Sequence, residues 1–168
     1  MKPLSTPFLA SLLFVAVLTG CDRRSKGTQN LQPQIDSLRL RLTNVYKPGM
    51  GEIMSNIQLH HAKLWFAGVN KNWPLAEYNE SLIQSAFKRI QLYHGDKFEA
   101  KAASMMIPSM DSMSNAIRQK DSRLFKTAFL FMTNTCNNCH TVTRHEFNVI
   151  IIPTIPPVSN QDFQTVKK

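Results

Sequence analysis

Hydrophobic residues recur at spacings of three and four through most of residues 31–142, the period of helices with one buried side. The first such stretch has alternating spacings of four and three, typical of a coiled coil, and predicts a helix over 35–47 that Pro48 and Gly49 end. Its seam residues are Leu31, Ile35, Leu38, Leu42 and Val45. Two heptads are too short to be stable alone, so we expect this helix to pack on the rest of the chain or, slightly favoured, to pair with a second copy as a homodimer.

Longer helical segments follow, each with an apolar side and a polar side. They run over about 50–67, 73–95, 98–117 and 121–142. Short loops between helices of similar length place neighbouring helices antiparallel. The sequence therefore predicts an all-α fold: an antiparallel four-helix bundle over residues 50–147 with an additional N-terminal helix and an extended C-terminal tail.

Residues that break or cap helices set the expected boundaries. Gly68 is expected to stop the first long helix, and Pro108 to kink the third or to leave one backbone carbonyl for another partner. Asp96 with Glu99 three residues later resembles a capping box, and Asp121 or Ser122 is expected to open the fourth helix. The methionines of the third segment, at helical spacing, are interpreted as core residues rather than metal ligands.

The tail, residues 148–168, begins with the apolar run Val149–Ile152 and then contains three prolines that exclude further helix. An apolar run left in water would form an exposed patch. We expect the tail to run extended along the bundle, covering its surface up to about Phe163. A strand that binds a partner is the alternative.

The first 20 residues have a basic start and an apolar run from Phe8 to Leu18, which is too short to span a bilayer. The ending Leu18-Thr19-Gly20-Cys21 resembles the lipobox of bacterial lipoproteins, in which the cysteine is acylated. Residues 21–34 are polar and predict a tether. The alternative is an ordinary secretory signal with Cys21 a stray thiol. Both indicate export to the periplasm, and Asp22 slightly favours retention of a lipoprotein at the inner membrane.

The net charge of +9 comes from Lys and Arg residues scattered over all segments, which indicates a solvated surface and no nucleic-acid patch. No nucleophile–base pair and no phosphate-binding loop occur in the sequence, so we do not expect an enzyme.

Late in the fourth long segment stands Cys136-Asn137-Asn138-Cys139-His140. Cys-x-x-Cys-His is the attachment signature of a c-type haem. Residues three and four apart share a helix face, so both thiols can reach one porphyrin edge while His140 ligates the iron. The sequence thus predicts one covalent haem c.

Other chemistries explain the motif less well. A redox Cys-x-x-Cys is expected in a strand–helix setting, and a Cys136–Cys139 disulfide within a helix would be strained. A zinc site needs two more ligands, and the adjacent His60 and His61 point to different helix faces.

A Cys-x-x-Cys-His in the last helix of a four-helix bundle resembles the class II cytochromes c, which include cytochrome c prime. The resemblance covers about residues 50–147 and is specific only at Cys136, Cys139 and His140. Together with the export signal and the lipobox, it implies a periplasmic, membrane-anchored electron carrier with an unidentified redox partner. The chain departs from that family at its lipid anchor, in the helix before Pro48 and after Phe147. The alternatives are a haem protein that binds or senses NO or CO, and a structural lipoprotein that haem stabilises.

The resemblance also implies that the first bundle helix covers the second axial face of the haem. Met54 and His61 share one seam of that helix with Ile57 and Leu64. If His140 lies late in an antiparallel helix, its height matches the early part of the first helix, which favours Met54 as the sixth ligand. His61 and an open site are the alternatives.

Overall fold

The computed structural model describes residues 31–43 and 45–165, and within these residues the chain is all-α, with no strand. The expected signal segment over 1–20, the expected lipidation site Cys21 and most of the expected tether lie outside the described residues. The chain divides into two units, residues 1–46 and 47–168. No helix in the described part is long and apolar enough to cross a membrane.

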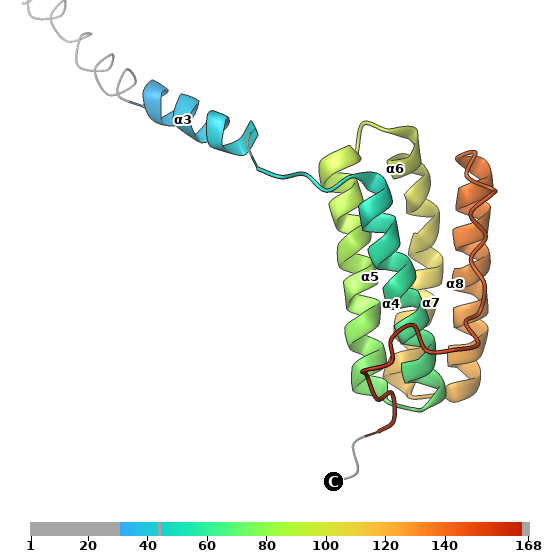
Figure 1. Ribbon diagram of the computed structural model, residues 1–168. Helices are drawn as coiled ribbons and strands as arrows, with labels where there is room; N and C mark the ends of the chain where they lie inside the picture. Colours follow the sequence, from blue (N-terminus) through green and yellow to red (C-terminus); the bar gives the residue numbers. More distant parts are fainter. Residues whose placement is uncertain (1–30, 44, 166–168) are drawn as a thin grey trace, which may run out of the picture. The chain divides into compact units, whose positions relative to one another are not determined.

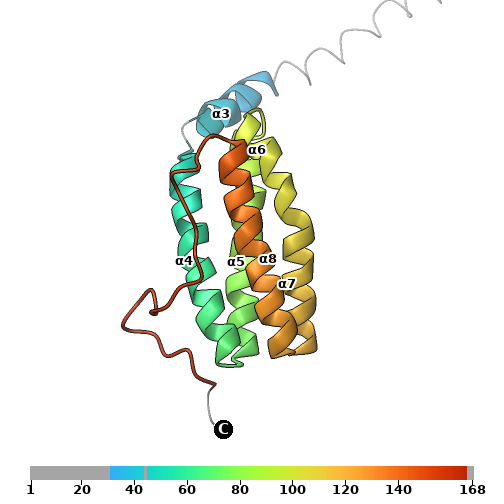
Figure 2. The ribbon, with the colours of Figure 1, turned by 90° about the vertical axis from the view of Figure 1, so that its right-hand side faces the viewer.

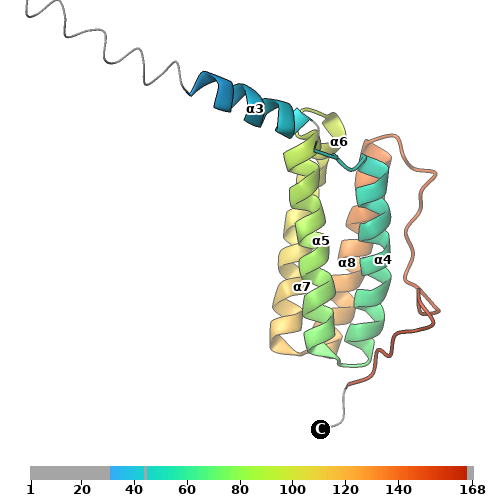
Figure 3. The ribbon, with the colours of Figure 1, turned by 60° about the vertical axis from the view of Figure 1, so that its left-hand side comes forward.

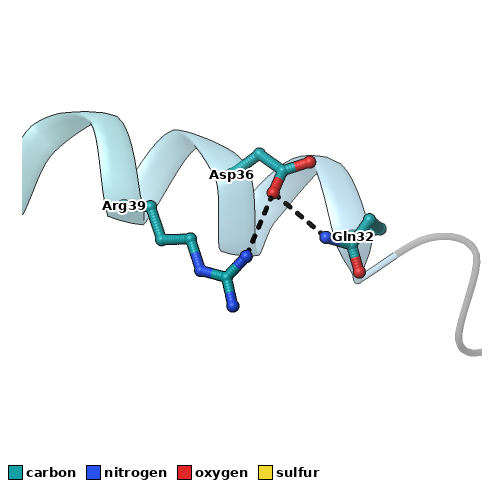
Figure 4. Close-up of polar contacts among 3 residues, drawn as sticks. All are labelled: Gln32, Asp36 and Arg39. Carbon is teal, nitrogen blue, oxygen red and sulfur yellow. Dashed lines mark hydrogen bonds and ion pairs between the residues drawn. The ribbon is translucent and has the colours of Figure 1, made fainter.

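In the first unit, α3 spans Gln32–Thr43. It begins earlier than expected because Pro33 is tolerated in a first turn, and it ends before Val45. A local network holds its exposed face: Gln32 Nε2 donates to Asp36 Oδ1 at 3.0 Å, and Arg39 lies 3.8 Å from the same oxygen (Figure 4). The seam leucines are exposed, Leu38 at 58%.

In the second unit, the long helices α4, α5, α7 and α8 lie side by side (Figure 1). Each contacts its neighbours in the order α4–α5–α7–α8, and α8 also contacts α4. Their bounds are Met50–Val69, Trp73–His94, Ile107–Gln119 and Ser122–Val142. Their facing sides form one hydrophobic core, in which Phe125 and Phe129 are completely buried beside Trp65.

Polar side chains cap two of these helices. Asn72 Oδ1 accepts from Leu75 N–H at the start of α5, and Asp121 Oδ1 accepts from two backbone N–H groups at the start of α8. The expectation that Asp121 or Ser122 opens the fourth helix is confirmed. The α4, α7 and α8 helices end through left-handed residues that are not glycine: Lys71, Lys120 and Arg144.

Gly68 does not stop the first long helix, so that expectation was wrong. It lies inside α4, where a Cβ atom would collide with the Phe125 ring. The glycine therefore serves close packing between α4 and α8.

The third long segment is not one kinked helix. It consists of α6 (Phe98–Ala102), a 3₁₀ turn (Ala103–Met106) and α7. Pro108 lacks an N–H, and its ring would clash with the carbonyl of Ser104 in a continuous α-helix, so a new helix begins at Ile107. Asp96 is not the cap either, because Lys97 occupies that position without a side-chain bond.

Three methionines of the third segment are buried, and one histidine at the end of α5 is half-buried. Met106, Met110 and Met113 are buried in the core, as the helical spacing predicted. His94 is half-buried, and its Nε2 lies 3.0 Å from the carbonyl oxygen of Pro48.

After α8 the chain turns back and runs without helix or strand beside α4 (Figures 2 and 3). Phe163 is only 5% exposed and packs against Phe66 at the far end of α4, with ring centres 5.7 Å apart. Asn72 Nδ2 donates to the Gln164 carbonyl. The tail is thus fixed to the helices near both of its ends.

Candidate functional site

Cys136, Cys139 and His140 lie on the last turns of α8 and line a single cavity of about 310 Å³. Cys139 is buried, Cys136 is half-buried, and both thiols are free. The opposite wall comes from α4 and includes Met54 and His61. The structure therefore brings together every candidate site residue that falls in its described part.

The cavity wall is largely apolar. Ile57, Phe87, Met106 and Ile150 contribute hydrophobic side chains from four different segments of the chain. Such an apolar lining with a few convergent polar groups is typical of cofactor sites, and the cavity volume is within their usual range.

The turn after α8 fixes the His140 ring. Its Nδ1 atom lies 2.6 Å from the carbonyl oxygen of Asn148. A carbonyl can only accept, so Nδ1 carries the proton and Nε2 keeps its lone pair. This is the tautomer in which histidine ligates a metal through Nε2, with the other ring nitrogen donating to the backbone.

Burial raises the pKa of the Cys136 thiol to about 12, and the neighbouring Cys139 contributes in the same direction. Burial also raises the pKa of Cys139. A reactive redox pair requires a lowered thiol pKa, so this environment is unlike that of a disulfide oxidoreductase.

His61 is only 4% exposed and bonds to α8: its Nε2 lies 2.9 Å from Thr133 Oγ1. The Thr133 hydroxyl donates to the carbonyl of Phe129, so it accepts from His61 and Nε2 carries the proton. Burial lowers the pKa of His61 to about 4. Since Nε2 is engaged, only Nδ1 keeps a lone pair. The Met54 side chain is not held by a hydrogen bond of this kind. It is half-buried and lies one turn after Met50.

His60 faces elsewhere. Its Nδ1 lies 3.0 Å from Asn79 Oδ1 of α5, whereas the adjacent His61 contacts α8. Of the two histidines, only His61 therefore lines the cavity with the cysteines. Among the described residues, no group of three His, Cys, Asp or Glu side chains is placed to hold a metal ion.

Sequence reasoning missed Asn137, inside the Cys-x-x-Cys-His motif. Its amide bonds twice to the backbone of Ile150: Nδ2 donates to the carbonyl at 2.8 Å, and Oδ1 accepts from the N–H at 2.7 Å. No local signal marks this residue, because its partner lies 13 positions away in a segment without periodic pattern.

The residues present fit a haem: two free thiols, a histidine with an available Nε2 and an apolar wall surround one cavity. Lys97 and Glu99 also line this cavity, so its wall contains one positive and one negative side chain. The chain matches no family model, no curated protein and no solved structure.

Proposed function

We propose that this protein is an exported, lipid-anchored c-type cytochrome that carries single electrons, built as an antiparallel four-helix bundle like that of the class II cytochromes c. The observation that supports it most is the arrangement of Cys136, Cys139 and His140 around one cavity, with His140 Nδ1 donating to the Asn148 carbonyl.

Each residue has a defined task in this proposal. Cys136 and Cys139 form thioether bonds to one haem, and His140 binds through Nε2. Ile57, Phe87 and Met106 keep water from that group. Haem supplies the one-electron chemistry, while the chain sets its orientation and dielectric surroundings. The redox partner is an unidentified protein, and pairing of two copies through α3 stays a prediction.

Covalent attachment is tested by extraction with acidified acetone and by intact mass. The haem is expected to remain on the chain and to add one haem mass to the polypeptide. Replacing both cysteines, Cys136→Ser with Cys139→Ser, is expected to make it extractable. Asn138→Ala, at an exposed position inside the motif, is the matched control and should retain it. A haem that solvent removes from the wild-type chain would overturn the proposal.

The main rival is binding of NO or CO at an open iron position. Two observations support an open position: Met54 is only partly buried, and His61, which lines the same cavity, already uses its Nε2 to bond Thr133.

We propose instead that Met54 is the sixth ligand, which predicts a low-spin ferric spectrum with a weak far-red charge-transfer band. Met54→Ala should abolish that band and admit CO. A high-spin spectrum in the wild-type protein would favour the gas-binding function instead.

A further inference from the structure

The atom that fixes His140 is a backbone oxygen, that of Asn148. No side-chain substitution can remove a carbonyl, so its position depends on the chain on either side of it: the turn that precedes Asn148 and residues 148–152, here named the strap. The strap is extended, with Ile150 and Ile152 turned toward the helices and Val149 and Ile151 exposed.

Asn137 holds the strap at one point. Its side-chain amide pairs with the peptide groups of Ile150 through both a donor and an acceptor, as a neighbouring strand would. Two bonds to one residue fix both the position and the register of the strap, because a shift by one residue would break both.

The spacing between Asn137 and His140 on α8 is similar to the spacing between the strap residues that they contact. Asn137 and His140 are three apart and therefore neighbours on one helix face, with side chains about 5–6 Å apart. Their partners Asn148 and Ile150 are two residues apart in a segment without helix or strand, and a fully extended chain would span about 6.6 Å over that separation. The strap thus lies against α8 so that the Ile150 clamp places the Asn148 carbonyl at the His140 ring.

We propose that Asn137 is a positioning residue for the axial histidine: by clamping Ile150 it holds the Asn148 carbonyl against His140 Nδ1. This inference rests on the proposed function, since without haem the orientation of His140 has no redox consequence. A hydrogen bond from the second ring nitrogen raises the basicity of a ligating histidine and fixes its orientation. We therefore expect the clamp to favour the oxidised state of the iron and to restrict the orientations of the His140 ring.

A competing explanation is that the turn after α8 positions Asn148 without the clamp. Asn148 N–H donates to the His145 carbonyl at 2.9 Å, and His145 N–H donates to the His140 carbonyl at 2.7 Å. The two explanations differ in what removal of the Asn137 amide does to the iron.

The test uses the full-length, haem-loaded protein. Asn137→Leu is expected to keep covalent haem, to raise the reduction potential and to broaden the ferric electron paramagnetic resonance signal, because the His140 ring loses a fixed acceptor. Protease cleavage within the strap should become faster. Asn138→Leu, the same substitution at the adjacent exposed position, should change none of these.

A second variant leaves the motif intact. Ile150→Pro removes the N–H that donates to Asn137 Oδ1, and it should shift the potential in the same direction as Asn137→Leu. If Asn137→Leu does not fold or load haem, Ile150→Pro alone tests whether the clamp positions His140.

If Asn137→Leu and Ile150→Pro carry haem and their potentials equal that of Asn138→Leu, the clamp does not position His140 and the inference is overturned. Faster cleavage of the strap with an unchanged potential overturns it equally, because Asn148 then moves without affecting the iron. A wild-type chain without covalent haem is a different result, which contradicts the proposed function itself.

Discussion

At the scale of single residues, His61 is a histidine held neutral inside the protein. Burial lowers its pKa to about 4, while an unfolded chain takes up the proton near the ordinary value of 6.5. The unfolded state therefore binds more protons between these values. The stability that neutral His61 contributes is present above about pH 6.5 and is lost as the pH falls toward about 4.

His61→Gln should remove much of this pH dependence. Between pH 7 and 4.5 we expect the free energy of unfolding of the wild-type protein to fall by roughly 2 kcal/mol more than that of the variant. Denaturant unfolding at the two pH values measures the difference. His145→Gln, at an exposed histidine, is the control and should behave as wild type. Equal pH dependence in the wild type and His61→Gln would mean that His61 is not held neutral.

The sequence identified Cys136, Cys139 and His140 because all three lie on one helix at fixed spacing, so local geometry alone brings them together. It favoured Met54 over His61 only by the expected height along the helix, because both lie on one seam of that helix. The structure distinguishes them only through Thr133 on α8, a contact 72 positions away. Asn137 could not be found for the same reason, because its partner belongs to the non-periodic strap.

At the scale of helices and turns, the sequence predicted a helix boundary correctly where a single residue determines it, and incorrectly where tertiary packing determines it. Asp121 caps α8 through its own carboxylate, which is a local property. Gly68 indicated a helix end by its type, but the Phe125 ring from α8 occupies the space beside it, and that contact cannot be deduced from local sequence.

Two glycines of α4 give opposite predictions for the same substitution. Gly68→Ala would place a methyl group on the Phe125 ring, so we expect a loss of about 1–3 kcal/mol in stability. Gly51→Ala meets nothing within 4 Å and should be neutral or stabilise by up to about 1 kcal/mol, because alanine favours the helix. Thermal or denaturant unfolding of the two variants measures both effects. A Gly68→Ala protein as stable as Gly51→Ala would show that α4 and α8 do not pack this closely.

At the scale of the whole molecule, the all-α class followed from the helical period of the hydrophobic positions, and the described residues confirm it. The tail was predictable only in outline: its prolines exclude helix, but burial of Phe163 against Phe66 depends on the far end of α4. Since the lipidation site lies outside the described residues, membrane attachment stays a prediction from sequence.

Two sequence features near the N-terminus would attach the chain to a membrane: acylation of Cys21 and the basic residues after it. Their expected contributions to membrane affinity differ in size. The acyl chains predicted on Cys21 would contribute about 0.8 kcal/mol for each buried methylene group, and two or more chains give stable anchoring. Arg23, Arg24 and Lys26 lie in the predicted solvated tether, and they would add about 1 kcal/mol each only where they meet an anionic surface, an attraction that salt screens. The lipid should therefore dominate the attachment, and the basic residues should matter only at low ionic strength.

Cys21→Ala is accordingly expected to move the protein from the membrane fraction to the soluble fraction at high salt, with partial retention at low salt. The matched variant keeps Cys21 and replaces Arg23 and Arg24 by glutamine. It should stay in the membrane fraction at every salt concentration, because its acyl chains remain. Fractionation followed by mass analysis of the N-terminal peptide measures both location and acylation. If Cys21→Ala stays bound at high salt, the attachment resides elsewhere in the chain, and the lipoprotein assignment is wrong.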